Sequence, residues 1–352
     1  MPKRPTQADV AELAGVSRAT VSYVLNQRVE RDIPISDETR QRVWDAAQRL
    51  GYEPSALAQN LKAGHSYTIG VLTPNLHNLH YLEILDSVEA EAASNGYHLS
   101  VVSSNFDLER ERSCLSSLLQ QRLDGVVLMP TFLDMLTEEL ATLRQRMRPA
   151  VSLIKVEGFD CVVSDIYQGA EALMDHLLGL GHRRIALVNG VVRRTLTAER
   201  QRAYHSKLTA AGVPEAQHLV VDCGPTMDDA YEATLQLLDM DPCPTAIWTI
   251  NDLLAVGALR AIHERGLRVP ADVAVAGYDD SALAAQLYPP LTSVRSRAHD
   301  LGRRAVQILL RRIEEPAGAL SQEVIPVDLV VRQSTIGNGV IPTVAVAQAI
   351  EV

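Results

Sequence analysis

The chain has 352 residues, of which 47% are hydrophobic and 22% charged, an ordinary balance for a globular protein of about two to three domains. No apolar run reaches the ~18–20 residues that a membrane-spanning helix needs, and no apolar segment follows the amino-terminal charges, so neither a membrane protein nor a secreted one is indicated. The four cysteines stand far apart without a CxxC pair, which indicates neither a disulfide framework nor a zinc site. We expect a reduced, cytoplasmic protein without a metal or a cofactor.

Charge is unevenly distributed along the chain. Residues 1–64 hold nine Lys/Arg and eight Asp/Glu, a net charge of +1, whereas the remaining 288 residues have a net charge of −11. A surface that binds nucleic acid would therefore lie in the first segment. Because the basic excess there is small, charge alone does not predict DNA binding.

The first 50 residues predict three short helices. Residues suited to amino-terminal caps precede them: Thr6, Ser17 and Ser36. Gly15 and Gly51 follow the first and third helices, where a left-handed cap would end them.

A Gly-containing turn, "AGVS", joins the first two helices in a helix-turn-helix arrangement. Apolar residues share the inner face of the second helix, and its outer face presents Arg18, Ala19, Ser22, Tyr23 and Asn26. The turn, the caps and the amino-terminal position favour DNA binding. The alternative is a small helical subdomain with a tight turn.

Residues 52–64, "YEPSALAQNLKAG", have helical composition between Pro54 and Gly64. The segment is too short to be a stable helix alone, because isolated helices under ~12–15 residues are marginal. It is either a linker that folds when a partner is present or an ordinary interdomain linker.

From residue 67 onward, short apolar runs rich in β-branched residues alternate with segments of helix length. They form two series: "YTIGVLTP", "HLSVVSSN", "GVVLMP" and "AVSLI", then "RIALVNG", "HLVVD", "TAIWTI" and "VAVAGYDD". This alternation predicts two doubly wound subdomains with parallel sheets covered on both faces. Ligands bind beyond the carboxyl ends of such strands. The candidate site is therefore residues 73–81, 129–132, 189–200, 251–252 and 279–280.

Several independent motifs in order resemble the lactose-repressor (LacI/GalR) family of bacterial transcription regulators over residues 6 to about 335. They are "ADVAELAGVSRATVSYVLN", "ISDETRQRVWDAAQRLGYEPSALAQNL", "SDIYQGAEALMDHLLGLGHRRIALVNG", "IWTINDLLAVGALRAIHERGLRVPADVAVAGYDD" and "PPLTSVR". The resemblance implies an all-α helix-turn-helix DNA-binding domain followed by an α/β periplasmic-binding-protein-like core of two doubly wound parallel-sheet subdomains. The expected boundaries are 1–51 for the DNA-binding domain, 52–65 for a hinge helix, 66–340 for the core and 341–352 for a tail. Within the core, the first subdomain is about 66–164 and 293–325, and the second about 165–292 and 326–340.

The family resemblance implies a homodimer that binds a near-palindromic operator in double-stranded DNA, most simply as a repressor. Matching positions place Arg18, Ala19 and Tyr23 at base edges in the major groove. The positions implied at phosphates are Thr6, Ser17, Thr20 and Asn26; helix packing is an equally open role for Thr20. Tyr23 stands where many members have Arg, and it cannot make the two-pronged guanine contact of an Arg. We therefore expect an operator that differs at that base pair.

The same resemblance makes residues 52–65 a hinge helix that orders on specific DNA and enters the minor groove beside its partner. The residues implied there are Ala58, Gln59 and Leu61. Leu61 matches a leucine that wedges between base pairs, and such wedges kink DNA at a cost of a few kcal/mol that added contacts offset. Gln59 replaces a common Arg, which puts one contact in doubt.

In the core, the resemblance implies a cleft between the subdomains for a small-molecule effector, a sugar or a related polar metabolite. The implied effector-binding residues are Asn78, His80, Tyr81, Arg200, Asn251 and Asp279. A guanidinium, an amide and a carboxylate together can hold adjacent hydroxyl groups. Asn251 has an alternative role as the cap of the helix that follows, and both roles together are possible.

Several pocket positions depart from the family pattern. His80 replaces an aromatic residue, Ser296 and Ala298 replace bulkier side chains, Ala203 replaces a glycine, and Pro225 stands where some members have tryptophan. Aromatic residues make up only 4% of the chain. A pocket with few stacking rings makes another small polar metabolite as plausible as a sugar.

Occupancy of the cleft is expected to change the spacing of the two hinge segments and so the DNA-bound population, with release by an inducer as the default. The last residues lack the leucine heptads of a tetramer-forming helix, which favours a dimer. An enzyme is the first rival, but no GxGxxG, GxxxxGK[ST] or GxSxG motif is present. The amino-terminal helices and the missing secretion signal argue against a periplasmic binding protein.

Overall fold

The computed structural model describes residues 5–25, 35–52, 65–132, 135–145, 149–190 and 194–336. The chain divides into two compact units, Met1–Tyr67 and Thr68–Val352. Four of the predicted DNA contacts, Asn26, Ala58, Gln59 and Leu61, lie outside the described residues, as does the tail 341–352, so those predictions stay predictions. No described helix is both long and apolar enough to cross a membrane.

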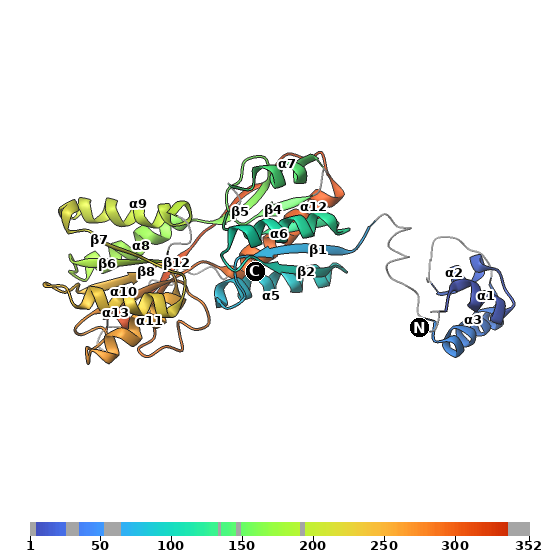
Figure 1. The fold of residues 1–352 in the computed structure, drawn as a ribbon, viewed down its shortest axis with the longest axis horizontal. Helices are drawn as coiled ribbons and strands as arrows, with labels where there is room; N and C mark the ends of the chain where they lie inside the picture. The colour runs from blue at the N-terminus through green and yellow to red at the C-terminus, as the bar shows by residue number, and fades with distance from the viewer. Residues whose placement is uncertain are drawn as a thin grey trace, which may run out of the picture. The chain divides into compact units, whose positions relative to one another are not determined.

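The first unit is a bundle of three helices, shown in blue in Figure 1. They are α1 (Gln7–Ala14), α2 (Arg18–Leu25) and α3 (Asp37–Leu50). Its core is small and aliphatic, with Val10, Val21, Val24 and Val43 almost completely buried. The predicted inner face of the second helix is therefore confirmed.

Local caps fix the ends of these helices as the sequence predicts. The backbone N–H of Asp9 donates to Thr6 Oγ1, and the N–H of Thr6 donates to the Asp9 carboxylate, so the capping box is complete. The C-caps, Gly15 and Gly51, have φ angles of 65° and 60°. Glycine adopts this left-handed conformation without the steric cost of a Cβ.

The second unit contains two six-stranded sheets. The first has the order β11-β5-β4-β3-β1-β2, with β1 (Thr68–Thr73), β2 (His98–Ser103), β3 (Gly125–Leu128), β4 (Ala150–Ser152), β5 (Asp160–Ser164) and β11 (Gln322–Ile325). The second has the order β12-β10-β9-β8-β6-β7, with β6 (Ile185–Gly190), β7 (Leu219–Cys223), β8 (Ala246–Thr249), β9 (Ala274–Asp279), β10 (Thr292–Arg295) and β12 (Asp328–Val330). All pairings are parallel except that of β10 with β12. The eight predicted strands are confirmed, and β5, β10, β11 and β12 were not predicted.

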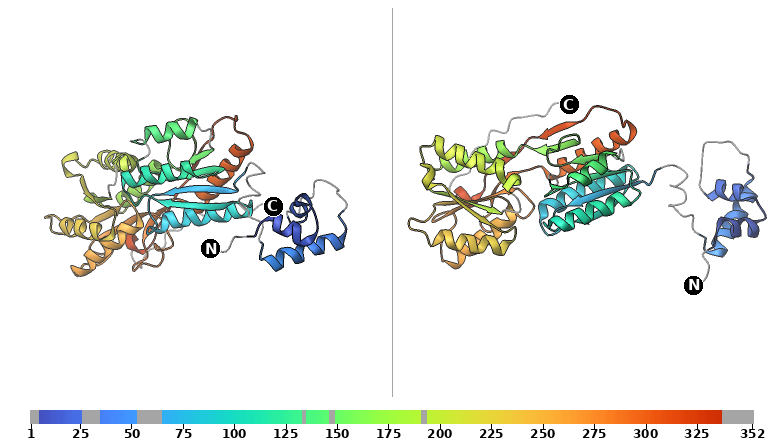
Figure 2. Two further views of the ribbon diagram at one scale, coloured as in Figure 1. Left: turned by 45° about the vertical axis from the view of Figure 1, so that its right-hand side comes forward. Right: turned by 45° about the horizontal axis from the view of Figure 1, so that its top comes forward.

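Helices cover both faces of each sheet (Figure 2). Those of the first subdomain are α5 (Leu79–Ser94), α6 (Leu108–Gln120), α7 (Thr137–Gln145) and α12 (Ala298–Glu314). Those of the second are α8 (Ile166–Gly179), α9 (Arg194–Ala210), α10 (Met227–Leu238), α11 (Asp252–Glu264) and α13 (Gln333–Ile336), with a 3-10 turn at Glu215–Gln217. On the first sheet, α5 packs with α12 over one apolar cluster, and the leucines of α6 and α7 belong to another. The doubly wound core expected from the sequence is therefore confirmed.

Three passages of the chain connect the two sheets, from β5 to α8, from β10 to α12 and from β11 to β12. Hydrogen bonds tie these passages together: Ser164 Oγ to Ser296 O (3.1 Å), Asp165 N to Ile325 O (3.1 Å) and Arg297 Nη2 to Asp328 Oδ2 (2.7 Å). Because β10 pairs with β9, the chain leaves the second sheet only after Arg295. The expected subdomain boundary near residue 293 falls inside this strand.

Candidate functional site

The predicted DNA-recognition helix, α2, has its first turn stabilised by an amino-terminal cap. Ser17 Oγ accepts a hydrogen bond from the backbone N–H of Thr20 at 3.1 Å and lies 2.9 Å from Thr20 Oγ1. The Thr20 hydroxyl thus has a partner in the residue that caps its own helix. Its predicted roles, phosphate contact or helix packing, stay predictions. The hydroxyl of Thr6 likewise donates to Asp9 Oδ2 at 2.7 Å.

The three predicted major-groove residues on the outer face of α2 differ in solvent exposure. Arg18 and Ala19 are exposed, whereas Tyr23 is half-buried. Arg18 makes no hydrogen bond or ion pair with any residue that the structure describes, so the folded unit does not already occupy its five donors. The ring of Tyr23 is available only in part.

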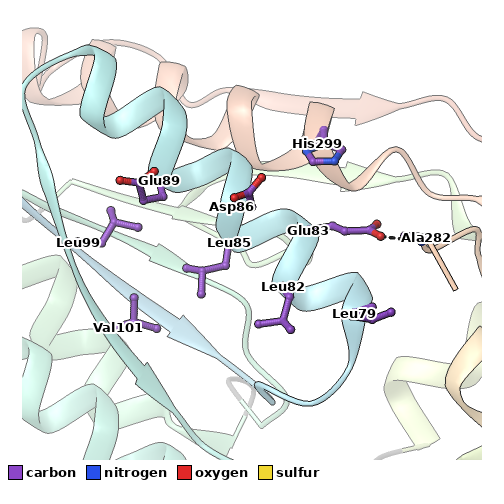
Figure 3. Close-up of a pocket in the computed structure, with 10 residues that line it drawn as sticks. All are labelled: Leu79, Leu82, Glu83, Leu85, Asp86, Glu89, Leu99, Val101, Ala282 and His299. Atoms are coloured by element: carbon purple, nitrogen blue, oxygen red, sulfur yellow. Dashed lines mark hydrogen bonds between the residues drawn. The ribbon is translucent and has the colours of Figure 1, made fainter.

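A hollow of about 700 Å³ lies on the outer side of α5 and β2 (Figure 3). It is lined mainly by the leucines of α5 and by Leu99 and Val101 of β2. Val101 is 39% exposed and Leu79 is 38% exposed, although both are apolar. β2 is also an edge strand of its sheet, so this face combines exposed apolar side chains with unpaired backbone groups.

Beside this hollow, Glu83 of α5 joins the two subdomains. Its Oε1 accepts a hydrogen bond from the backbone N–H of Ala282, which follows β9, at 2.8 Å (Figure 3). The first turn of α5 is thereby held against the carboxyl end of β9. The candidate effector residues lie at this meeting point.

Four of the predicted effector residues come together from separate elements. His80 and Tyr81 follow β1 in the first turn of α5, Arg200 lies on α9, and Asp279 ends β9. His80 Nδ1 is 3.9 Å from Asp279 Oδ1. The pKa of Tyr81 is raised by its burial and by the Asp279 charge, against the opposing effect of Arg200. The carboxyl ends of the two sheets therefore share one polar site, as the doubly wound pattern predicts.

Arg200 and Asp279 are the charged groups at the centre of this site. The guanidinium carbon of Arg200 lies 4.3 Å from the centroid of the Tyr278 ring, and its Nε is buried without a hydrogen-bond partner among the described residues. Asp279 is only 7% exposed, and no described residue donates a hydrogen bond to its carboxylate. Burial raises the pKa of Asp279 to about 7, although Arg200 opposes the shift. A guanidinium Nε and a carboxyl group that both lack hydrogen-bond partners are suited to a ligand that both accepts and donates hydrogen bonds.

The other two predicted effector residues, Asn78 and Asn251, cap helices. Asn78 Oδ1 accepts from the backbone N–H of His80 at 3.0 Å, and Asn251 Oδ1 accepts from that of Leu254 at 2.9 Å. The capping role of Asn251 is confirmed. Its contact with an effector stays a prediction.

Further buried polar atoms at the strand ends have no hydrogen-bond partner among the described residues. They are Ser104 Oγ after β2, Thr131 Oγ1 after β3 and Asn189 Oδ1 on β6. Leaving a buried polar group unpaired costs about 1–3 kcal/mol, so these atoms at the strand ends are available to a polar ligand or to water. Thr131 and Asn189 fall within the predicted site segments, whereas Ser104 was missed.

A second aromatic ring, that of Phe106, was also missed. Its centroid lies 6.3 Å from that of Tyr81 in an edge-to-face arrangement. Asn105 and Phe106 have φ angles of 51° and 58°, which non-glycine residues rarely adopt. A turn that carries no glycine offered no sequence signal for this conformation. The site therefore contains more aromatic rings than the low aromatic content of the chain suggested.

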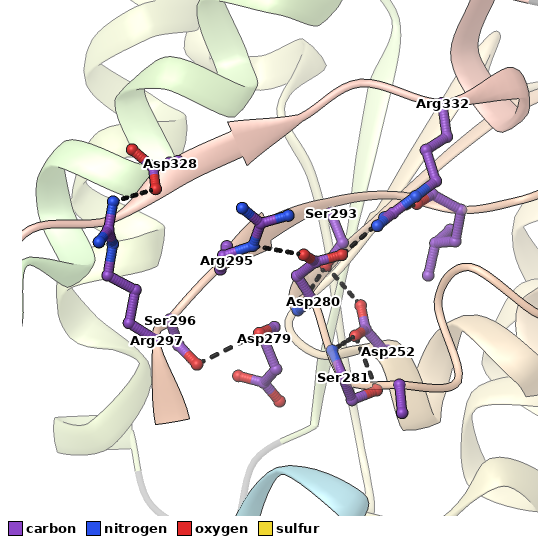
Figure 4. A network of polar contacts seen from close by, with 12 residues as sticks. Asp252, Asp279, Asp280, Ser281, Ser293, Arg295, Ser296, Arg297, Asp328 and Arg332 are labelled. Atoms are coloured by element: carbon purple, nitrogen blue, oxygen red, sulfur yellow. Dashed lines mark hydrogen bonds and ion pairs between the residues drawn. The ribbon is translucent and has the colours of Figure 1, made fainter. Parts of the chain in front are cut away.

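A buried carboxylate, Asp252, lies beside Asp279 in the network of Figure 4. It accepts hydrogen bonds from Ser281 N (2.7 Å), Ser281 Oγ (3.0 Å) and Ser293 Oγ (2.5 Å). Burial and the Asp279 charge raise the pKa of Asp252 to about 8 despite these bonds. Asp252 thus holds the segment after β9 against β10.

The next carboxylate, Asp280, binds two arginines, Arg295 at the end of β10 and Arg332 between β12 and α13. Arg295 Nε donates to its Oδ2 at 2.9 Å, and Arg332 Nη1 lies 2.6 Å from its Oδ1 (Figure 4). Asp279 and Asp280 have φ angles of 103° and 50°. The bonds to Asp280 offset the cost of this backbone and connect the candidate effector site with the passages between subdomains.

Two family models match the chain. The model of bacterial regulatory proteins of the lacI family matches residues 6–55, and that of periplasmic binding protein-like domains matches residues 174–335. The HTH-type transcriptional repressor PurR of Vibrio atlanticus (strain LGP32) is 32% identical over 315 residues, covering 88% of this chain and 92% of the relative. The ribose operon repressor of Escherichia coli (strain K12) is 33% identical over 319 residues, covering 88% and 94%. These relatives are transcriptional repressors rather than enzymes.

Solved structures agree with the sequence relatives. The lac repressor dimer bound to operator and the anti-inducer ONPF is 31% identical with a TM-score of 0.80, covering 95% of this chain and 99% of that chain. A LacI family transcriptional regulator from Enterococcus faecium with bound ribose is 27% identical with a TM-score of 0.70, covering 76% and 98%. The described residues include no group of three or more His, Cys, Asp or Glu that could hold a metal ion.

Proposed function

Because the chain belongs to the LacI family of bacterial regulatory proteins, we propose that it represses transcription as a homodimer on a near-palindromic operator, under the control of a small polar effector. One observation carries the effector control. The Arg200 side chain is half-buried and the Asp279 carboxyl group is buried, and neither the Arg200 Nε nor the Asp279 carboxyl group has a hydrogen-bond partner among the described residues. A ligand that made hydrogen bonds to both groups would gain more binding free energy than it could from hydrogen bonds to exposed groups.

For DNA, we assign base contacts to Arg18, Ala19 and Tyr23, in keeping with the exposure of Arg18 on α2. A bidentate Arg–guanine pair discriminates by about 1–3 kcal/mol. Phosphate contacts fall to Thr6, Ser17, Thr20 and Asn26. Thr6 and Ser17 lie at helix amino termini, where backbone N–H groups favour phosphate. Such a regulator acts in the cytoplasm.

Residues 52–65 act in this proposal as a hinge helix in the minor groove, with contacts from Ala58, Gln59 and Leu61. Replacing Leu61 with Ala should weaken specific DNA binding more than nonspecific binding, because only specific DNA is kinked by the wedge. Equal losses would remove Leu61 from this role.

The homodimer is assigned to the face formed by α5 and β2. Its exposed apolar residues and its edge strand suit a second copy of the chain, since a stable dimer buries such surface. The related lac repressor structure is described as a dimer. The variant Val101→Asp should sediment as a monomer at concentrations where the unaltered chain is a dimer.

The effector is proposed to be a sugar or a related polar metabolite that contacts His80, Tyr81, Arg200, Asn251 and Asp279, with Asn78 supporting the first turn of α5. Ribose is named for the ribose operon repressors among the relatives and is bound in similar structures of LacI family regulators, which makes it the first compound to test. The rings of Tyr81 and Phe106 offer apolar contact for a sugar face.

Control of DNA binding follows in this proposal from the hydrogen bonds that link the effector site to the chain segments that join the two subdomains. Asp279 O accepts from Ser296 N and from Ser296 Oγ, both at 3.2 Å, and Ser296 begins the passage to the first subdomain. A ligand that moves Asp279 therefore shifts the relation between the subdomains, and through it the hinge segments. Release of DNA by the ligand is the default direction.

The proposal is tested by selecting DNA sites from a random library and then measuring affinity for the selected site. We expect a near-palindromic site whose affinity changes when one of D-ribose, cellobiose, adenine or guanine is added. Absence of any preferred site, with or without these compounds, would exclude the proposed function.

A further inference from the structure

Two positions that depart from the family pattern, His80 and Ser296, contact each other. His80 Nδ1 lies 3.2 Å from Ser296 Oγ, although the residues are 216 positions apart. His80 belongs to α5 of the first subdomain, and Ser296 begins the passage from β10 to α12. The contact therefore fixes a cleft side chain to a segment that joins the two subdomains.

Hydrogen counting at this contact favours one of the two His80 nitrogens as the protonated one. A serine hydroxyl has one hydrogen, and that of Ser296 is donated to the carbonyl oxygen of Asp279 at 3.2 Å (Figure 4). The carbonyl oxygen can only accept. With its hydrogen on that carbonyl oxygen, Ser296 Oγ is left to accept from His80, which favours a proton on Nδ1. The Asp279 carboxylate, 3.9 Å from Nδ1, favours the same arrangement.

The charge of the ring follows from its surroundings. Burial lowers the pKa of His80 to about 4, a shift that Arg200 of α9 reinforces and Glu83 of α5 opposes. Asp279 of β9 is the other charged group that faces the ring. The imidazole is therefore neutral at pH 7, and a neutral imidazole has only one N–H. With the proton on Nδ1, Nε2 carries a lone pair.

We infer that Ser296 and Asp279 fix His80 in its Nδ1–H tautomer, so that Nε2 accepts a hydrogen bond from a hydroxyl or N–H group of the effector. Nε2 has no hydrogen-bond partner among the described residues, and the side chain keeps 14% of its surface exposed. The inference rests on the proposed function in placing the effector at this cleft. Ser296 is a positioning residue, and His80 is the residue that selects the ligand.

The inference restricts the class of effector. At the atom that meets Nε2, the ligand must present a hydrogen-bond donor. An ether or methoxy oxygen there would place two lone pairs against each other, so a methylated analogue should bind about tenfold or more weakly than its parent hydroxyl compound. Sugars and compounds with ring N–H groups remain within this class.

The tautomer can be measured directly in the full chain with no ligand present. In protein labelled with ¹⁵N at histidine, the imidazole nitrogens report whether each is protonated, and the His80 signals are those absent from His80→Gln. At pH 7 we expect a protonated Nδ1 and an unprotonated Nε2. A protonated Nε2, alone or in an imidazolium, would overturn the inference whether or not the proposed function holds.

Two variants at Ser296 separate positioning from packing. Ser296→Ala removes the acceptor and should yield a mixture of tautomers, whereas Ser296→Thr keeps a hydroxyl and should retain the Nδ1–H form. An unchanged tautomer in Ser296→Ala would remove Ser296 from this role. For a test compound that the unaltered chain binds, Ser296→Ala should weaken binding several-fold and Ser296→Thr should restore it. Failure of all test compounds to bind would count against the proposed function, while the spectrum would still decide the tautomer.

Discussion

The helical unit carries its candidate base contacts on one eight-residue helix, whereas the cleft collects its candidate effector contacts from α5, α9 and β9. On α2 the important side chain, Arg18, is exposed and makes no bond to a described residue. In the candidate effector site the important side chains are Arg200, which is half-buried, and Asp279, which is buried beside the hydrogen-bonded Asp252 and Asp280.

This difference teaches how function and stability are related in each region. A side chain that does not support the fold can change without affecting stability, so the DNA preference of α2 is free to vary. A buried polar group contributes to both function and stability, because its loss leaves other buried groups without hydrogen-bond partners. Substitutions on α2 should therefore change function with little effect on stability, whereas substitutions of buried polar groups in the core should change both.

The largest expected effect lies at Glu111 of α6, which binds the backbone of the predicted site segment after β3. This carboxylate is completely buried and accepts hydrogen bonds from the backbone N–H groups of Thr131 (3.0 Å) and Phe132 (2.8 Å). Glu111→Ala should lower the free energy of unfolding by about 2–5 kcal/mol, because both N–H groups lose their acceptor. The exposed Glu109 on the same helix is the control, and Glu109→Ala should change it by less than about 1 kcal/mol. Equal losses in urea unfolding would contradict the contrast between buried and exposed groups.

The next effect separates two arginines of α9. Arg200→Leu should weaken effector binding roughly tenfold to a hundredfold, because a hydrogen bond to a charged group contributes about 1.5–3 kcal/mol. Arg202, which is 62% exposed and pairs with Glu199, is the matched control. Arg202→Leu should leave binding within about twofold. Calorimetry with the first compound found to bind makes the measurement, and similar losses in both variants would remove Arg200 from the effector site.

A smaller effect on operator binding, with almost none on the free energy of unfolding, is expected for the recognition helix α2. Arg18→Ala should weaken binding to the selected operator by about 1–3 kcal/mol, with a smaller loss on unrelated DNA. The free energy of unfolding should change by less than about 0.5 kcal/mol. Fluorescence anisotropy and urea unfolding measure the two quantities. A large loss of stability would show that Arg18 supports the fold after all.

The smallest effect is a dependence of core stability on pH. Since the folded-state pKa values of Asp252 and Asp279 are raised above the ordinary 3.8, the folded core holds protons that the unfolded chain releases. Their stabilising contribution is complete below pH 3.8 and is lost as the pH rises through about 7 to 8. The lowered pKa of His80 acts in the opposite direction, but only between about 4 and 6.5.

Unfolding measurements between pH 6.5 and pH 8 therefore isolate the two carboxyl groups. Stability should fall across this window by up to about 1 kcal/mol per pH unit for each group. The variant Asp279→Asn should flatten the decline. A stability that rose with pH in the same window would contradict the burial of these carboxyl groups in the folded core.

The sequence predicted the helical unit more completely than the cleft, because its signals are local. A cap and its partner stand three residues apart, as Thr6 and Asp9 do, and a helix end is marked by a glycine such as Gly15. The eight predicted strands are also local signals, since buried parallel strands are continuous apolar runs. Four strands were missed. Two of them, β11 and β12, are three or four residues long and only partly buried. The other two, β5 and β10, are mostly buried, and the apolar pattern did not single them out.

The cleft depends on contacts that no local pattern encodes. Ser296 and His80 stand 216 residues apart, and their separate departures from the family pattern gave no sign that they touch. Phe106 reaches Tyr81 through a positive φ angle at a residue that is not glycine. The sequence named Arg200 and Asp279 by resemblance, but their lack of hydrogen-bond partners became visible only in the folded core.

The central claim is that occupancy of the cleft controls binding at the operator. The most direct measurement is a titration of the full chain with its selected operator in the presence and absence of a compound that calorimetry shows to bind. The account predicts that the compound changes operator affinity about tenfold or more in the unaltered chain and has no such effect in Asp279→Ala. An operator affinity that stays the same while the compound is bound at the cleft would contradict it.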